Sequence, residues 1–231
     1  MDFTQHTITD LFFDLDHTLY DFEKNSELAF HEIFQKLELN GVDDFMIHFK
    51  PINDYYWDLL SRNEITHDEL RISRLKDTFE KINVVVTEDQ IRCIADEFIA
   101  NLTRFTHVFE GTHESLEYLQ SKYRLHIITN GPDHVQVTKL KNTGLEKYFE
   151  TVTNSEISGV KKPNAGIFTY ALNLARVKPE NSVMIGDNLT ADVHGALNVG
   201  MHVIWFNEAN QKTEVNGFKE IRHLLELKEI L

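Results

Sequence analysis

Short, nearly continuous runs of apolar residues are spread along the chain and predict the strands of a buried parallel sheet. Three runs are clear, at residues 10–15, 125–129 and 183–185; a fourth at 202–206 is similar, and one at 151–153 is weaker. Segments with helical spacing lie between them, at residues 135–142, 166–175 and 191–198. This alternation of strand and helix predicts an α/β fold in which helices cover both faces of a parallel sheet.

Residues 21–106 interrupt that alternation with a long segment of helical pattern. Thr66 and Thr87 each stand three residues before a Glu or Gln, the spacing of a capping box that opens a helix. Apolar residues repeat at helical intervals in this segment, which is typical of packing in a helical bundle; they are Leu28, Ala29, Ile33, Phe34 and Leu37, and then Ile91, Ile94, Ala95, Phe98 and Leu102. The prediction is a Rossmann-like α/β core formed by residues 1–20 and 107–231, with an inserted all-helical domain at 21–106.

Charge and composition narrow the classes of partner. The 23 basic and 37 acidic residues give a net charge of -14, which disfavours binding to nucleic acid or to anionic membranes. No apolar run reaches the roughly 18 residues of a membrane helix, and residues 1–5 lack the pattern of a signal peptide. The single cysteine, Cys93, cannot form an internal disulfide, and the 12 histidines show no metal-binding spacing. A soluble cytoplasmic protein is expected.

Two clusters of polar residues follow predicted strands in the first part of the core. Asp14 and Asp16 lie two residues apart after an apolar run, so both acids can be presented at the same strand end. Thr129, Asn130 and Gly131 end another strand, where a hydroxyl and backbone amides could hold phosphate oxygens. Solvated acids in the first case and an ordinary turn in the second are the alternatives.

Two more clusters follow in the last third of the chain. Lys161 and Lys162 precede Pro163 at the start of a helix, where a lysine gains nothing from the helix dipole and could instead face a phosphate. Asp187 and Asp192 bracket a strand-to-helix turn, and their oxygens suit Mg²⁺. The alternatives are solvent-facing lysines and an N-capping role for Asp187 or Asn188. Parallel topology would bring all four clusters to the carboxyl edge of the sheet, where ligands bind in such folds.

The order of these clusters, Asp-Leu-Asp-His-Thr, Thr-Asn-Gly, Lys-Lys-Pro and Gly-Asp-Asn with Ala-Asp, resembles the four motifs of the haloacid dehalogenase-like superfamily. The resemblance covers nearly the whole chain. It implies a phosphatase in which Asp14 attacks phosphorus and Asp16 is the general acid and base. It also implies the remaining site: phosphate binding at Thr129, Asn130 and Gly131, a catalytic lysine at Lys162 with Lys161 in reserve, Mg²⁺ held by Asp14, Asp16 and Asp187, and support from Asp192.

The amino-acid sequence of the motifs is similar to that of bacterial pyrimidine 5′-nucleotidases, which implies a nucleoside monophosphate as substrate. Sugar-phosphate phosphatases, phosphoglucomutase-like enzymes and a catalytically idle regulatory protein remain as alternatives. In the family the helical insertion is a mobile cap, so Arg74 is a candidate substrate contact, although helix-spaced arginines more often form ion pairs in solvent. A monomer or small homo-oligomer is expected.

Overall fold

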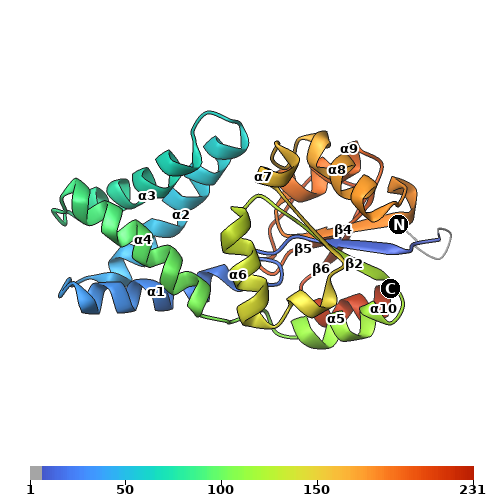
Figure 1. Ribbon diagram of the computed structural model, residues 1–231, viewed down its shortest axis with the longest axis horizontal. Helices are drawn as coiled ribbons and strands as arrows, with labels where there is room; N and C mark the ends of the chain where they lie inside the picture. The colour runs from blue at the N-terminus through green and yellow to red at the C-terminus, as the bar shows by residue number, and fades with distance from the viewer. Residues whose placement is uncertain (1–6) are drawn as a thin grey trace. The chain divides into compact units, whose positions relative to one another are not determined.

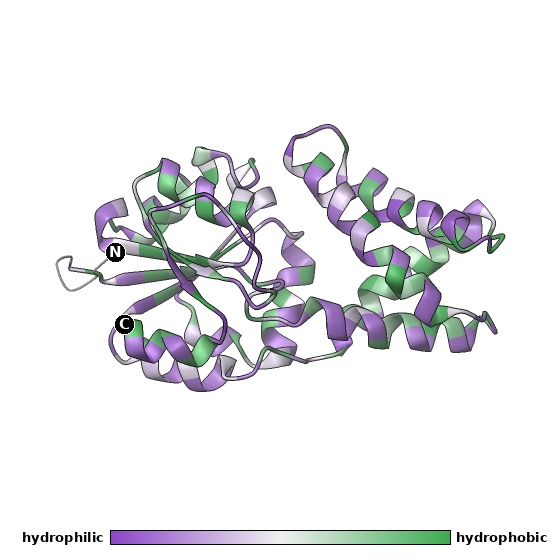
Figure 2. Ribbon diagram, turned by 180° about the vertical axis from the view of Figure 1, so that it is seen from behind, coloured by the Kyte–Doolittle hydropathy of each residue, from purple (hydrophilic) through white to green (hydrophobic). Residues whose placement is uncertain are grey.

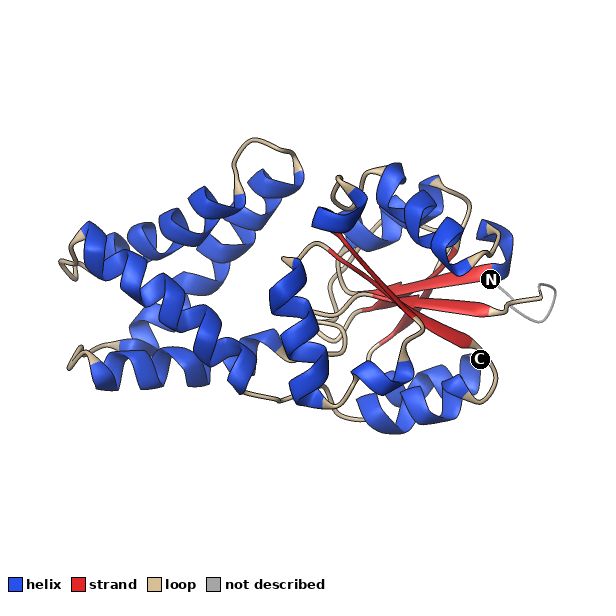
Figure 3. Ribbon diagram, viewed as in Figure 1, coloured by secondary structure: helices blue, strands red, loops and turns tan. Residues whose placement is uncertain are grey.

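The computed structural model describes residues 7–231, and the chain divides into two compact units. One unit takes in the chain up to Asp21 and again from His107 to Leu231; the other is Phe22–Thr106. Figure 3 shows that the strands belong to the first unit and that the second is built from helices. Residues 1–5, where no signal peptide is predicted, lie outside the described part of the chain.

The first unit is built on a six-stranded, wholly parallel sheet with strand order β3-β2-β1-β4-β5-β6. The strands are β1 (Asp10–Phe13), β2 (Arg124–Thr129), β3 (Thr151–Asn154), β4 (Ser182–Gly186), β5 (His202–Phe206) and β6 (Lys219–Ile221). The first five correspond to the five apolar runs, while β6 has no such signal in the sequence. The predicted α/β fold with a parallel sheet is confirmed.

Helices cover the two faces of the sheet, with α8 and α9 on one side and α5 and α10 on the other (Figure 1). The helices of this unit are α5 (Thr112–Gln120), α6 (Asp133–Thr143), α7 (Ser155–Ser158), α8 (Ala165–Ala175), a π-helix (Leu189–His194), α9 (Gly195–Asn198) and α10 (Leu227–Ile230). On the α8 and α9 side, Phe12, Met184 and Trp205 pack against Ile167 and Phe168 in a buried core. Burial of these apolar side chains is the main force that holds the helices to the sheet.

The register of the sheet places the carboxyl ends of β1, β2 and β4 within two residues of one another. Phe13, the last residue of β1, pairs with Ile127 on β2 and with Ile185 on β4. The residues that follow these positions therefore emerge at one edge of the sheet. Asp14 is the first of them.

The second unit contains four long helices, α1 (Phe22–Lys36), α2 (Val42–Ser61), α3 (His67–Lys81) and α4 (Glu88–Arg104). Both expected capping boxes are present, at Thr66 before α3 and at Thr87 before α4. Hydrophobic and hydrophilic residues alternate along these helices in Figure 2. Buried phenylalanines from several of the helices meet in a cluster of aromatic rings. Phe30 stacks on Phe98 and also contacts Phe45 and Phe49. This unit therefore has a hydrophobic core of its own.

The chain leaves and re-enters the α/β unit at neighbouring positions. The Asp21 backbone N–H donates to the His107 carbonyl at 3.1 Å, and Tyr20 forms an antiparallel bridge with Val108. The two connecting segments are thus joined by main-chain bonds. None of the helices within residues 7–231 combines the length and the apolar composition needed to cross a membrane.

Candidate active site

Asp14 and Lys162 form the buried centre of the carboxyl edge of the sheet. The Lys162 ammonium donates to Asp14 Oδ1 at 2.6 Å and to the Ile128 carbonyl at 2.8 Å, and it lies 2.7 Å from Asp192 Oδ1. Asp14 and Lys162 are 8% and 2% exposed, so this contact is largely shielded from water. Of the two neighbouring lysines, it is Lys162 whose ammonium reaches the strand-end aspartate.

Burial and charge act on these two groups in opposite senses. Burial raises the pKa of Asp14 to about 7, and the nearby Asp192 adds to the shift, although the Lys162 ammonium opposes it. For Lys162, burial alone would lower the pKa, but Asp14 and Asp192 outweigh it and raise the pKa above the usual value. The lysine therefore remains a cation, whereas Asp14 binds a proton more readily than a solvated aspartate does.

Asp187 and Asp192 come from the turn between β4 and the π-helix. Asn188 is the residue that caps this turn, since its side chain accepts the backbone N–H groups of Thr190 and Ala191. The capping role proposed as an alternative for Asp187 thus belongs to Asn188. The side chain of Asp187 instead accepts from the Thr18 hydroxyl at 3.2 Å.

Two further contacts fix the backbone of this turn. Trp205 Nε1, on the adjacent strand β5, donates to the Asp187 carbonyl at 2.7 Å. Gly186 leaves room for Asp192, because a Cβ at position 186 would lie 2.4 Å from its Oδ2 atom. The backbone N–H of Asn188 donates to that same Oδ2 atom at 3.1 Å. A larger residue at position 186 would therefore displace Asp192 from both Asn188 and Lys162.

The acids at this edge match the requirements of a divalent cation. One oxygen from each of Asp14, Asp187 and Asp192 lies within 4.8 Å of the others. Burial, followed by repulsion from Asp14 and Asp192, raises the pKa of Asp187 well above its usual value. Asp14, Asp16, Asp187 and Asp192 supply four carboxylates against the two ammonium groups of Lys162 and Lys139, a difference of two negative charges. Bound Mg²⁺ would neutralise this difference, so the residues fit the ion.

Asp16 has a separate set of partners on α6. The Lys139 ammonium pairs with Asp16 Oδ1, and Gln136 Nε2 donates to Oδ2 at 2.8 Å. Burial alone would raise the pKa of Asp16, but the charge and hydrogen bond of Lys139, with the bond from Gln136, hold it below the usual value. The two acids of the first motif thus have opposite tendencies: Asp16 is stabilised as a carboxylate and Asp14 is not.

The Thr129–Asn130–Gly131 turn ends β2 beside these acids. Thr129 Oγ1 accepts from Gln136 Nε2 at 2.7 Å and from the Gly131 N–H at 3.3 Å, and its hydroxyl proton can still be donated to a phosphate oxygen. The Asn130 side chain binds the backbone of Lys162 in both directions, at 3.0 and 2.7 Å. The Asn130 side chain therefore positions the segment that carries the lysine, and phosphate binding at this turn stays a prediction.

Comparison with known proteins agrees with this arrangement. The family model for haloacid dehalogenase-like hydrolases matches residues 11–200, which include all four clusters. The chain belongs to this family. The pyrimidine 5′-nucleotidase PynA of Streptococcus pneumoniae is 31% identical over 202 residues, which are 85% of this chain and 83% of PynA. A glyceraldehyde 3-phosphate phosphatase of Pyrococcus furiosus is 34% identical over 208 residues, with 85% of this chain and 79% of that protein covered.

A solved structure extends the comparison to the fold of the whole chain. The HAD-hydrolase YfnB of Bacillus subtilis, in a crystal form bound to magnesium, superposes with a TM-score of 0.89 at 27% identity. The match covers 96% of this chain and 98% of YfnB. The haloacid dehalogenase-like fold is therefore shared over nearly the full length of both chains.

Arg74, for which the family resemblance suggests a contact with substrate, lies inside the helical unit. It is 3% exposed, its guanidinium lies 5.1 Å from the Phe98 ring centroid and 5.6 Å from that of Phe49, and it donates to Asn53 Oδ1 at 2.7 Å. Burial lowers its pKa to about 9. Arg71, one turn away, does form surface ion pairs, with Asp68 and Asp96. Packing explains the position of Arg74, so it is not carried into the proposed substrate site.

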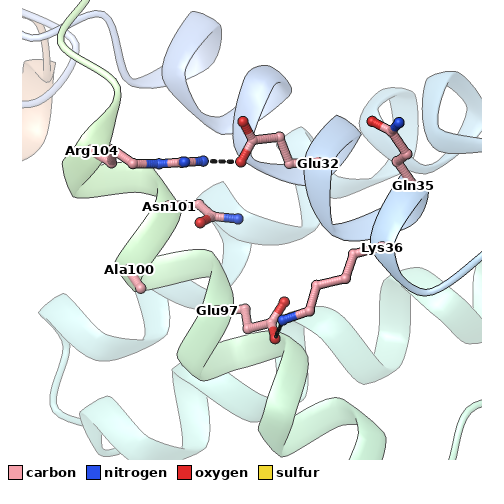
Figure 4. A pocket seen from close by; sticks show the side chains of 7 residues that line it. All are labelled: Glu32, Gln35, Lys36, Glu97, Ala100, Asn101 and Arg104. Atoms are coloured by element: carbon pink, nitrogen blue, oxygen red, sulfur yellow. Dashed lines mark hydrogen bonds and ion pairs between the residues drawn. The ribbon is translucent and has the colours of Figure 1, made fainter.

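A hollow on the helical unit has no catalytic character. It is lined by side chains of α1 and α4, and its charged residues are already paired with one another, as Figure 4 shows for Arg104 with Glu32 and Lys36 with Glu97. A charged ligand would have to break these pairs to bind there. The chemistry of this haloacid dehalogenase-like protein is concentrated instead at the carboxyl edge of the sheet.

Sequence reasoning missed four residues that contact the site: Thr18, Gln136, Lys139 and Trp205. Thr18 is the last residue of the first motif, where its place could have indicated a role, whereas Trp205 carries no distinguishing signal because a tryptophan within a strand is ordinary. Gln136 and Lys139 could have been found from spacing. They stand three residues apart on α6 beside the buried Val135 and Leu140, so polar groups lie on the inward face of that helix.

Proposed function

We propose that this haloacid dehalogenase-like hydrolase is a Mg²⁺-dependent phosphatase of small phosphomonoesters that uses Asp14 as a covalent nucleophile. The observation that carries the proposal is the contact between Asp14 and the buried Lys162 ammonium, with Asp16 two residues further along and Asp187 at the same edge. A carboxylate at a strand end, next to a fixed cation, is suited to receive a phosphoryl group. Positioning and neutralisation of charge dominate the catalysis of phosphoryl transfer.

The proposed reaction has two halves. In the first, a carboxylate oxygen of deprotonated Asp14 bonds to phosphorus, the bond from phosphorus to the leaving oxygen breaks, and Asp16 in its protonated form gives its proton to that oxygen. The contacts that favour the Asp16 carboxylate make the protonated form a ready donor. In the second, Asp16 takes a proton from water as the water oxygen attacks phosphorus, which releases phosphate and restores Asp14. Thr129 and Lys162 would hold the phosphate oxygens through a hydroxyl and an ammonium.

Mg²⁺ would be held by the side chains of Asp14 and Asp187 and by the backbone carbonyl of Asp16. When bound, the ion would offset the negative charge that phosphate adds to this acidic edge. Asp192 would act through its contacts with Lys162 and the Asn188 N–H, which keep both groups in place.

Pyrimidine nucleoside 5′-monophosphates are the substrates that we propose. Support comes from the similarity of the motifs to those of pyrimidine 5′-nucleotidases and from the 31% identity with PynA. The helical unit Phe22–Thr106 is proposed to serve as the cap that selects the substrate. Sugar phosphates form a second candidate class, favoured by the 34% identity with the glyceraldehyde 3-phosphate phosphatase.

A panel of phosphate esters tests both the Mg²⁺-dependent phosphatase activity and the preference for pyrimidine nucleotides. Release of phosphate from nucleoside monophosphates, triose and hexose phosphates and an aryl phosphate would be measured with Mg²⁺ and with EDTA. We expect turnover only with Mg²⁺, and the highest kcat/KM for pyrimidine nucleotides. A preference for sugar phosphates would overturn the nucleotidase assignment alone. No Mg²⁺-dependent turnover of any ester would favour a regulatory binding protein.

A further inference from the structure

Two residues outside the four motif clusters hold the proposed acid and base, Asp16. Lys139 pairs with its Oδ1 atom, and Gln136 donates to its Oδ2 atom, so each carboxylate oxygen has a donor from α6. The Gln136 amide also donates to Thr129 Oγ1 at 2.7 Å, and thereby ties Asp16 to the phosphate-binding turn.

The burial of these two side chains argues against an incidental surface pair. Gln136 is 0% and Lys139 is 3% exposed, and the Lys139 ammonium lies 4.7 Å from the centroid of the Tyr20 ring. An ammonium is costly to remove from water unless an opposite charge meets it. Exposed ion pairs are weak in part because holding two long side chains in one geometry costs entropy. The buried Lys139 side chain is already held in place by its surroundings.

We propose that Lys139 and Gln136 are positioning residues for the step in which the leaving group departs. The inference rests on the proposed phosphatase function and names residues that act on Asp16 without contacting the phosphorus. After Asp16 has given its proton to the leaving oxygen, its carboxylate carries the negative charge. The Lys139 ammonium and the Gln136 amide then stabilise that charge, and they hold the carboxylate beside Thr129 for the attack of water.

The chemistry of the leaving group offers a specific readout. An alcohol such as the 5′-oxygen of a nucleoside needs a proton as it departs, whereas a nitrophenolate leaves without one. The value of kcat/KM reports on the steps up to the departure of the leaving group. If Lys139 and Gln136 support Asp16 as the proton donor, replacing either one should lower kcat/KM more for strongly basic leaving oxygens than for weakly basic ones. The dependence of kcat/KM on the basicity of the leaving oxygen should therefore become steeper.

The experiment measures kcat/KM of the full-length protein with Mg²⁺ for a series of phenyl phosphates of graded leaving-group basicity and for one alkyl phosphate. Lys139→Met is compared with wild type, with Lys139→Arg as a conservative variant and with Lys141→Met, an exposed lysine on the same helix, as control. We expect Lys139→Met to lose roughly 10²-fold with the alkyl ester and under about 10-fold with 4-nitrophenyl phosphate. Lys139→Arg should recover part of the loss, and Lys141→Met should match wild type.

The outcomes separate the two proposals. Equal losses for all leaving groups, or no loss at all, would overturn the positioning role of Lys139 while the phosphatase function stands. Failure of wild type to hydrolyse any ester of the series would overturn the phosphatase function itself. If thermal unfolding shows that Lys139→Met does not fold, Gln136→Met replaces it with the same expected change in slope.

Discussion

Two buried aspartates at opposite ends of strand β1 have opposite electrostatic surroundings. Asp10, at the start of the strand, lies 2.7 Å from Arg124 and 2.9 Å from His126, and accepts from the Thr9 hydroxyl. Burial alone would raise its pKa, but the bonds from His126, Thr9 and Arg124 outweigh burial and lower it. Asp14, just after the strand, has its pKa raised to about 7 despite the Lys162 ammonium.

Burial alone would raise the pKa of both residues, so the partners at each end decide how far that effect is offset. At the amino end, positive and hydrogen-bonding groups satisfy a single acid. At the carboxyl end, Asp14 shares Lys162 with Asp192 and also faces the charges of Asp16 and Asp187. The contacts of Asp10 at the amino end of β1 therefore stabilise the fold. The carboxyl end at Asp14 instead has an excess of negative charge where a cation and a phosphate would bind.

The largest expected effect comes from Asp14→Asn. The amide cannot attack phosphorus, so we expect turnover to fall by about 10⁴-fold or more. The same change removes a carboxylate that is unfavourable in its buried site, so the melting temperature without Mg²⁺ should not decrease. Phosphate release and thermal unfolding check the two effects, and activity above a few per cent of wild type would contradict the nucleophile role.

Asp187→Ala should resemble removal of the metal. Loss of a proposed direct ligand should weaken the response to Mg²⁺ by more than the roughly 10–100-fold typical of outer partners of a metal site. Activity would be titrated with Mg²⁺ and with Ca²⁺, which prefers more ligands and should restore wild type poorly. Asp43→Ala, a change at an exposed acid of the helical unit, is the control. Normal activity of Asp187→Ala at low Mg²⁺ would remove this residue from the metal site.

Lys162→Ala and Lys161→Ala test which ammonium serves the centre. We expect the first variant to lose roughly 10²–10³-fold in kcat, as when one fixed donor to a developing charge is removed. The second should stay close to wild type, because the structure places Lys162 and not Lys161 against Asp14. Similar, mild losses in steady-state kinetics would exclude both lysines from the chemistry.

Asp10→Asn should affect stability and spare turnover. Removal of one charge from a buried pair leaves the partners unmatched, and we expect unfolding at neutral pH to become easier by about 3 kcal/mol, at the low end of such effects because Arg124 is partly exposed. Denaturant unfolding measures the loss. Reduced kcat in a variant that is fully folded would show that the two ends of the strand are not independent.

The pH dependence of stability should also differ between the ends. The raised pKa of Asp14 means that the metal-free folded state binds more protons than the unfolded state between about pH 4 and 7, so this contribution falls as pH rises. The lowered pKa of Asp10 gives a contribution that is present above about pH 4 and is lost on further acidification. Melting curves in EDTA across this range, compared with those of Asp14→Asn and Asp10→Asn, would separate the two. If the melting temperature of wild type changed with pH in the same way as that of Asp14→Asn, the predicted contribution of Asp14 would be contradicted.

The sequence predicted the parts of the fold in which one kind of residue dominates. Central strands are continuous apolar runs, and the buried stripe of α4 repeats at helical spacing, so both were predictable. Strand β6 is short and mostly polar, and its pairing with β5 is a tertiary effect. The helical segment after β4 begins at Leu189, two residues before the predicted start at residue 191, because Asn188 caps it.

The site shows the same division. Side chains at strand ends could be grouped from parallel topology alone, because the register places them at one edge. The partners supplied by α6 leave a weaker signal, since the spacing of Gln136 and Lys139 beside Val135 and Leu140 marks an inward face but does not state which acid they meet. Arg74 is a further case, for it lies four residues from Leu70 and from Thr78 on the buried stripe of α3. A charged residue on such a stripe is easily assumed to face solvent.

The closed junction between Asp21 and His107 has an implication for how such proteins diversify. The polar contacts described for the catalytic edge all join residues of the α/β unit, and the two residues that flank the insert, Asp21 and His107, are bonded to each other through their main chains. Recombination at this point could exchange one helical insert for another and leave the reaction centre intact. New substrate ranges could then arise by replacing a module, with no change to the inherited chemistry.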